Sequence, residues 1–551
     1  MLAKTARLAP VVCAFLILQL TCLSFGGVPA QLEQAETLLE KGQCQQAEAI
    51  YQQIVSQYPG TDDAFAAQKQ LTFLYIAWNR YPQAETAYNQ LLANFSGNKD
   101  ISQAVHDIAY RYRCVNKREK ANELDQYVVD TWPDSDYALL GQMDIAKYYV
   151  DQGDEPNAEA ATAKLLTNYS GHALIARAVH DVAQHYRYTQ RYKKANELYQ
   201  FVVETWPKAE HALWAQADLI KSYLALGDDS SAEAAVEKLL TNFKDNPLIA
   251  RAIWDTGQFY RDLKKYEMAN QLYKHVVENW PKAEHALWAQ ADLIKSYLAL
   301  EDDSSAEAAV EKLIADFSWS EHIARAIHDT AWEYRKLANY GWANELDQYV
   351  IDHWPKDVQA MWAKMDMAKT DIVLGNYATA DKTVDILIAD FSDQPELSTA
   401  IFMLGEQYYN KAFACENQGQ TAEAKSHFQK AIAIWERIIN ELPQSSITPQ
   451  AYYFAARCYD KLDQKAKALE YYQVVVDTWP DYEFSWHSQL SIARRFLELG
   501  KRQEIPMAEA VYNMREACRK VLSNYPDLGG DAAERMLRRW KAFKIEKGKK
   551  Q

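Results

Sequence analysis

The chain repeats itself: residues 208–240 read KAEHALWAQADLIKSYLALGDDSSAEAAVEKLL, and residues 282–314 read KAEHALWAQADLIKSYLALEDDSSAEAAVEKLI. The two stretches lie 74 residues apart and differ only at Gly227/Glu301 and Leu240/Ile314. Near-identity of this kind indicates tandem duplication. A period of this length predicts an array of stacked supersecondary units rather than several separate globular domains.

The 74-residue step extends well beyond these two stretches. An aromatic residue followed by proline recurs at Tyr58-Pro59, Trp132-Pro133, Trp206-Pro207, Trp280-Pro281 and Trp354-Pro355. A second aromatic marker keeps the same step, at Phe95, Tyr169, Phe243, Phe317 and Phe391. The two markers divide each unit into parts of 36 and 38 residues. Each part is long enough for two helices and their turns, and the proline predicts where a second helix ends.

One such part, residues 102–133, shows which family the pattern resembles. Ala109 and Tyr112 fall on one face of its first helix, Ala121 lies in the second, and Pro133 ends it. This spacing resembles positions 8, 11, 20 and 32 of the tetratricopeptide repeat, in its slightly longer bacterial envelope variety. Small residues let neighbouring helices approach closely, and the aromatic residue fills the gap between hairpins. The resemblance covers roughly residues 31–526.

The resemblance implies an all-α fold: a right-handed α-solenoid of about 13 helical hairpins with a C-terminal capping helix. We expect a signal peptide at residues 1–30 and a solenoid of 74-residue double repeats at residues 31–391. Divergent hairpins follow at residues 392–526, where the phasing breaks and an insertion occurs around Lys411–Ala424. Residues 527–551 are expected to hold the capping helix and a basic tail.

The first thirty residues have the features of an export signal. Lys4 and Arg7 precede an apolar run from Leu8 to Phe25, and small residues follow in Val28-Pro29-Ala30. Signal peptidase requires this order of a positive region, an apolar region and small residues. We therefore expect cleavage after Ala30 and a periplasmic or cell-envelope location.

Two other readings of this segment are less favoured. Pro10 and Gln19 interrupt the apolar run, which weakens it as an uncleaved membrane anchor. Cys22 suggests a lipoprotein, but Thr21 before it is a poor match to a lipobox. No later stretch approaches the ~18 apolar residues of a membrane helix, so we expect no transmembrane segment in the mature chain.

Composition excludes several classes of function. The net charge of −15 argues against nucleic acid as a partner, because phosphate binding needs a basic face. The five cysteines after residue 30 form an odd, widely spaced set, which does not fit a disulfide framework or a zinc finger. No Walker loop, GxSxG elbow or HExxH motif occurs. We therefore expect no catalytic residues, no cofactor and no metal.

Polar and aromatic side chains that recur at the 74-residue step are the candidate partner-binding residues. By the phasing of the family they lie on alternate first helices and line a concave groove that presents aromatic rings between cations. The set is His106, Arg113, His180, Arg187, Trp214, Lys221, Trp254, Arg261, Trp288, Lys295, His328, Arg335, Trp362 and Lys369. The four arginines predict a spaced cationic track for an acidic or carboxylate-bearing partner.

Each of these patterns also has a structural explanation. Asp218 and Lys221 have the spacing of an ordinary helix-surface ion pair. The arginines could instead pair with the aspartates that follow the histidine positions, Asp107, Asp181, Asp255 and Asp329. These His-Asp pairs do not predict a metal site, because they occur once per 74 residues and a metal needs three or four converging ligands. A further series is expected to bond across repeats: Asn122, Asn196, Asn270 and Asn344.

The leading functional hypothesis is a non-catalytic extracytoplasmic scaffold for other proteins or extended peptides. The chain is similar in this respect to BamD-like assembly lipoproteins and to the Tol–Pal coordinator type, which implies envelope assembly or maintenance. One alternative is a glycan- or peptidoglycan-binding module that uses the tryptophan-lined groove. Another is an accessory solenoid of a cell-wall lytic enzyme, although only about 25 residues follow Pro526, too few for a catalytic core.

Overall fold

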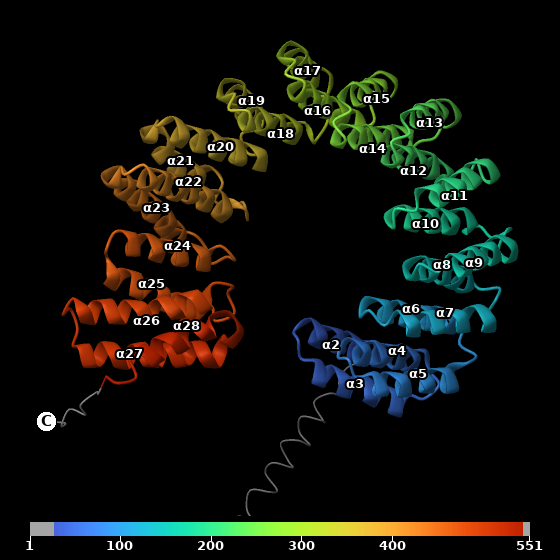
Figure 1. Cartoon of the computed structure of the whole chain (residues 1–551), viewed down its shortest axis with the longest axis horizontal. Coiled ribbons are helices and arrows are strands. Elements are labelled where there is room, and N and C mark those ends of the chain that lie inside the picture. Colours follow the sequence, from blue (N-terminus) through green and yellow to red (C-terminus); the bar gives the residue numbers. More distant parts are fainter. Residues whose placement is uncertain (1–26, 544–551) are drawn as a thin grey trace, which may run out of the picture. The chain divides into compact units, whose positions relative to one another are not determined.

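A computed structural model describes residues 27–543 of the 551-residue chain. Every regular element in that range is a helix, from α2 (Val28–Glu40) to α28 (Pro526–Arg539), and no strand occurs among the described residues (Figure 1). The predicted all-α class is confirmed. Most of the predicted signal peptide and the end of the basic tail lie outside the described residues. The handedness of the solenoid, the number of repeats and the predicted domain boundaries stay predictions.

The described residues divide into two compact units between residues 259 and 260, and α14 (Ile249–Asp262) contains the boundary. The other described helices of the first unit are α2, α3 (Cys44–Gln57), α4 (Asp62–Ala77), α5 (Tyr81–Phe95), α6 (Ile101–Cys114), α7 (Arg118–Thr131), α8 (Asp136–Gln152), α9 (Glu155–Asn168), α10 (Ile175–Tyr188), α11 (Tyr192–Thr205), α12 (Glu210–Leu226) and α13 (Asp229–Asn242). The two helices of each hairpin pack against each other, and some first helices also touch the next first helix, as α8 touches α10.

The second unit continues the same succession of helices. Its described helices are α15 (Tyr266–Asn279), α16 (Glu284–Ala299), α17 (Asp303–Asp316), α18 (Ile323–Lys336), α19 (Tyr340–His353), α20 (Val358–Leu374), α21 (Tyr377–Asp390), α22 (Leu397–Asn417), α23 (Thr421–Glu441), α24 (Thr448–Lys461), α25 (Lys465–Thr478), α26 (Ser485–Lys501), α27 (Met507–Asn524) and α28. The insertion around Lys411–Ala424 lengthens α22 and α23 to 21 residues each. Pro526 is the first residue of α28, a position that proline favours because no backbone N–H is needed there.

The aromatic-proline markers end second helices, as the sequence predicts. In α7 the last helical residue is Thr131, and Trp132 has left the helical conformation before Pro133. Proline disfavours the α conformation in the residue before it, and at these helix ends the break falls at the tryptophan. The same break follows α11 at Trp206 and α15 at Trp280. The hairpins are packed by fully buried alanines, among them Ala195 and Ala269.

In four hairpins, a buried glutamine links the two helices by a hydrogen bond. These glutamines were not among the residues predicted from the sequence. The side-chain amide of Gln68 donates to the carbonyl oxygen of Ala87 at 2.8 Å, and Gln142 donates to Ala161 at 3.0 Å. Gln216 donates to Ala235 at 2.8 Å and Gln290 to Ala309 at 2.7 Å. Each bond joins the first helix of a hairpin to its second helix. These four glutamines also keep the 74-residue step.

The cysteines that the structure describes are all unbonded. Cys415, Cys458 and Cys518 are buried, where a free cysteine acts as a small apolar core residue. Burial raises the pKa of Cys518 to about 11. Between residues 27 and 543, no helix combines the length and the apolar character required for crossing a membrane.

Candidate functional site

The predicted partner-binding residues all lie on first helices, and none of them is fully exposed. Their places are α6 for His106 and Arg113, α10 for His180 and Arg187, α12 for Trp214 and Lys221, α14 for Trp254 and Arg261, α16 for Trp288 and Lys295, α18 for His328 and Arg335, and α20 for Trp362 and Lys369. His180 and His328 are buried, and the others are half-buried. Their surroundings differ from one repeat to the next.

On α6, Arg113 is held between two carboxylates from two other helices. Its guanidinium contacts Asp125 of α7 closely, and its Nη2 lies 2.7 Å from Oδ2 of Asp144 on α8. His106 places Nδ1 3.1 Å from Oδ1 of Asp125, and Lys147 places Nζ 3.1 Å from Asp144. The Asp125 side chain is only 1% exposed. These ion pairs join three consecutive helices.

The same arrangement returns in the second unit, around Arg335 of α18. Its Nη2 lies 2.5 Å from Asp347 of α19, and its Nη1 lies 3.9 Å from Asp366 of α20. His328 places Nδ1 2.9 Å from Asp347. The arginine Nε also donates to the Thr370 hydroxyl at 2.8 Å. Arg335 is therefore held mainly through Nη2 and Nε, while its buried Nη1 has no hydrogen-bond partner among the described residues.

The two repeats between these clusters carry tyrosine where the outer repeats carry aspartate. Tyr199 and Tyr273 stand at the repeat positions that are equivalent to those of Asp125 and Asp347. Asp218 of α12 is then the carboxylate that faces Arg187, and it also lies 3.2 Å from His180 Nε2 and 3.2 Å from Lys221 Nζ.

Charge partners shift the pKa values in this inner cluster. Burial alone would raise the pKa of Asp218, but the hydrogen bond from His180 and the charges of Lys221 and Arg187 hold it well below its usual range. Burial alone would lower the pKa of His180, but its bonds to Asp181 and Asp218 raise it. The carboxylate is therefore charged at neutral pH, and protonation of the histidine is favoured.

The partners of the arginines differ from the structural alternative that the sequence suggested. Arg113 pairs with Asp125 and Asp144, whereas Asp107 pairs with Lys69 at 3.4 Å. In the second unit, Arg261 pairs with Asp292 at 2.8 Å. The pairing aspartate lies on the next first helix, 31 residues along the chain, because that helix packs beside the arginine. The Asp144/Lys147 pair at i, i+3 is present as the spacing indicates.

His106, Asp125 and Asp144 offer three possible metal-ligand atoms within 4.8 Å of one another. The 74-residue step separates equivalent residues of different repeats, whereas these three ligand atoms come from the neighbouring helices α6, α7 and α8. Arg113 already contacts both carboxylates, and Lys147 contacts Asp144. Two cations thus balance the two negative charges, and we interpret the cluster as an ion-pair cluster.

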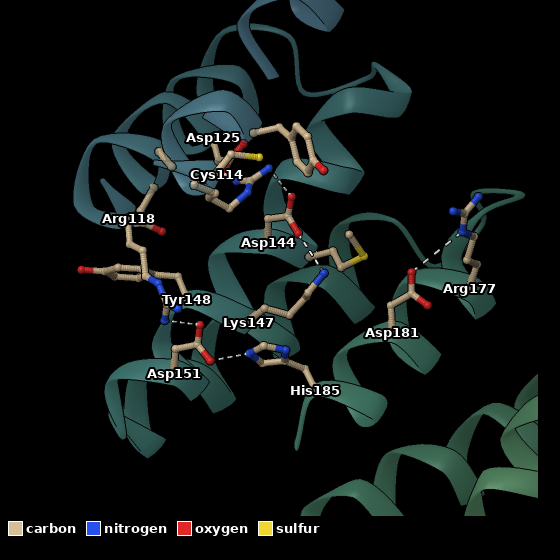
Figure 2. A pocket seen from close by; sticks show the side chains of 15 residues that line it. Cys114, Arg118, Asp125, Asp144, Lys147, Tyr148, Asp151, Arg177, Asp181 and His185 are labelled. Atoms are coloured by element: carbon tan, nitrogen blue, oxygen red, sulfur yellow. Dashed lines mark hydrogen bonds and ion pairs between the residues drawn. The ribbon is translucent and has the colours of Figure 1, made fainter. Parts of the chain in front are cut away.

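A cavity of about 570 Å³ opens beside the α6 cluster, between α6, α7, α8 and α10. Figure 2 shows its charged lining: Arg118 Nη1 lies 2.7 Å from Asp151, which also meets His185 at 2.7 Å. Arg177 and Asp181 form another pair, at 3.8 Å. Tyr110 adds an aromatic side chain to the lining and is 56% exposed. The lining therefore mixes both signs of charge with aromatic surface.

The asparagine series does not make the expected bonds across repeats through its side-chain oxygens. Oδ1 of each is buried and has no hydrogen-bond partner among the described residues: Asn122, Asn196, Asn270 and Asn344. Asn122 lines the cavity. Its oxygen is an unused acceptor at that place.

Comparison with known proteins identifies the repeats. Family models of the tetratricopeptide repeat match residues 29–61, 218–284 and 406–481. The chain contains tetratricopeptide repeats. The repeats themselves suggest a scaffold for protein–protein interaction, and proteins of this family are generally non-catalytic. No curated protein sequence matches the chain.

Solved structures similar to this tetratricopeptide-repeat chain include a repeat protein from Parabacteroides merdae, at 16% identity and a TM-score of 0.26, covering 50% of this chain and 96% of that one. Another is the C-terminal part of a repeat protein from Cytophaga hutchinsonii, at 13% identity and a TM-score of 0.29, covering 50% and 96%. A structure of Naa15/Naa10 bound to HypK matches at 16% identity and a TM-score of 0.33, covering 80% and 66%. TM-scores this low give these likenesses no weight for the arrangement of the whole chain.

The sequence analysis did not identify the residues that decide how the four predicted arginines, Arg113, Arg187, Arg261 and Arg335, are paired. Asp125, Tyr199, Tyr273 and Asp347 share the 74-residue step, so the signal was present. They lie on second helices, and tetratricopeptide phasing directs attention to first helices. The contact between residue 113 and residue 125 becomes visible only when the hairpin is folded.

Proposed function

We propose that this chain is a non-catalytic extracytoplasmic scaffold that binds partner proteins in the assembly or maintenance of a cell envelope. The tetratricopeptide repeats support protein binding. The observation that carries the proposal is the cavity of about 570 Å³ between α6, α7, α8 and α10. Glycan binding and an accessory role beside a lytic enzyme stay predictions.

The lining of that cavity suits a polypeptide segment. Arginine and tyrosine are enriched in protein interfaces, and both are present there as Arg118, Arg177, Tyr110 and Tyr148. Its charged groups occur as the pairs Arg118–Asp151 and Arg177–Asp181. A partner with charges of both signs can exchange ion pairs with these groups at little net cost, because exposed pairs contribute only about 0–1 kcal/mol each.

Export is part of the proposal and rests on the sequence of the first thirty residues. Cleavage after Ala30 would remove the first three residues of α2 and leave Gln31 at the new N-terminus. We expect N-terminal sequencing of the protein from an envelope fraction to begin near Gln31. Recovery of the protein from the cytoplasm with Met1 intact would contradict export.

Site-specific photo-cross-linking tests the scaffold function. A photo-reactive residue in place of Tyr110, which lines the cavity, should capture partner proteins in intact cells. The same residue in place of Glu237, which is exposed on α13, serves as the matched control. We expect protein adducts at position 110 that are absent at position 237. Equal adducts at both positions, or none at position 110, would contradict the assignment of this cavity.

A further inference from the structure

Arg187 of α10 is a largely buried guanidinium with unusually distant partners. Its side chain is 15% exposed. Its Nη2 lies 3.8 Å from Asp218, and its Nε lies 3.4 Å from the Tyr199 hydroxyl. An arginine carries five N–H donors, and a charge removed from water normally has close, charged partners. Arg187 therefore has donors to spare.

The equivalent arginine on α6 shows what is different here. Arg113 contacts two carboxylates, one of them at 2.7 Å, because Asp125 of α7 reaches it from the second helix. At the same step of α11 the chain has Tyr199, whose hydroxyl is neutral. The inner repeat thus keeps the arginine and loses one of its two negative partners.

Asp218 does not compensate for that loss. It is shared with Lys221 at 3.2 Å and with His180 at 3.2 Å. One carboxylate therefore serves two permanent cations, Arg187 and Lys221, as well as His180, so the α10–α12 cluster has at least one positive charge in excess. The neighbouring Asp181 is itself paired with Arg177, at 3.8 Å.

We propose that the α10–α12 surface binds an acidic segment of the partner protein, with a side-chain carboxylate of that segment reaching Arg187 and Lys221. The proposal rests on the scaffold function and names the chemistry of the partner. A negatively charged carboxylate complements the excess positive charge of Arg187 and Lys221. The Tyr188 ring, which is 66% exposed and lies 4.9 Å from the Arg187 guanidinium, offers the segment an adjacent apolar surface. The α6–α8 cluster is closed to the same ligand, because Asp125 already fills that role.

The chain supplies its own template for a test. Tyr199→Asp copies the α7 arrangement into α11 and gives Arg187 an internal carboxylate. The probe is a fluorescein-labelled peptide of ten glutamates, added to the mature full-length chain at low ionic strength and followed by fluorescence anisotropy. We expect Tyr199→Asp to weaken binding by at least about tenfold, the effect of one charge-assisted hydrogen bond. Lys193→Gln, an exposed change on the same helix with the same change in net charge, should leave binding within about twofold.

Arg187→Gln keeps the test decisive if the tyrosine change disturbs folding. This substitution should weaken binding of the glutamate peptide by at least about tenfold, while circular dichroism shows that the chain stays helical. Added salt should also weaken the binding of the peptide to the wild-type chain. Wild-type chain that fails to bind the peptide, or a folded Arg187→Gln chain that binds it like wild type, would overturn the proposal. Partner capture at position 110 together with either result would leave the scaffold function intact and remove only this inference.

Discussion

His487 of α26 makes the stability of the second unit sensitive to acid. Its Nδ1 lies 3.1 Å from the Tyr453 hydroxyl, an arrangement that suits a neutral ring. Burial, followed by the charges of Arg494, Arg457 and Arg495, lowers its pKa from 6.5 to about 4. Between these two pH values, His487 is therefore protonated in the unfolded chain and neutral in the folded chain.

It follows that the free energy of unfolding should decrease as pH falls from about 6.5 to about 4. His487→Asn should remove part of this slope, because asparagine does not titrate. Urea denaturation at several pH values in that range measures the effect. An identical slope in the variant would show that other groups cause it. His180 should act in the opposite sense: its pKa is raised, so its contribution is complete below about pH 6.5 and is lost as pH rises through the folded value.

Gly405 of α22 is required by the close approach of an indole ring. A Cβ added there would lie 2.7 Å from Cε2 of Trp435, which is fully buried and donates its N–H to the Phe402 carbonyl oxygen at 3.2 Å. Gly405→Ala should therefore lower the free energy of unfolding by about 1–3 kcal/mol. Gly341→Ala, in the open on α19, is the matched control and should raise it by about 0.5–1 kcal/mol. Thermal denaturation of the two variants checks both signs, and equal losses would contradict the packing argument.

At the scale of the helix, the two nearly identical segments allow a glycine and a glutamate to be compared at equivalent positions after a helix. Gly227 follows α12 with φ of 74°, and Glu301, its equivalent after α16, adopts φ of 59°. A side chain in this left-handed region costs about 1–2 kcal/mol, against the smaller entropic cost of glycine. Glu301→Gly should therefore stabilise the chain by about 0.5–1 kcal/mol, and Gly227→Glu should destabilise it by a similar amount. Chemical denaturation measures both, and two changes of the same sign would refute the explanation.

Helix ends were the part of the fold that the sequence predicted best. Proline after Trp132 or Trp206 acts on its immediate neighbour, so the signal is local and can be read from the residues alone. The pairing of Arg113 with Asp125 and Asp144 depends on which helices stack, which the 74-residue step does not state. The sequence therefore did not predict that Arg113 contacts two carboxylates whereas Arg187 contacts one carboxylate and a tyrosine hydroxyl, although all of these residues can be read from it.

At the scale of the whole chain, repeat arrays are stabilised by contacts between neighbours, and damage should stay local. Ala195 of α11 is fully buried where α11 meets α10 and α12. Ala195→Leu should overpack this contact and cost about 1–3 kcal/mol. Hydrogen exchange followed by mass spectrometry should show lost protection in α10–α13 and unchanged protection in α24–α27. Loss spread evenly along the chain would contradict nearest-neighbour stability.

The buried glutamines have a consequence for how a chain like this changes length. Each one finds its acceptor 19 residues later, inside its own hairpin, as Gln216 finds Ala235. A block of 74 residues therefore carries both ends of that bond. Unequal recombination in register can insert or delete one block and leave every such amide with its carbonyl, whereas loss of only one helix of a hairpin leaves a buried amide without its acceptor. Lengthening by whole blocks is thus the change that this architecture tolerates, and the two matching stretches record one such event.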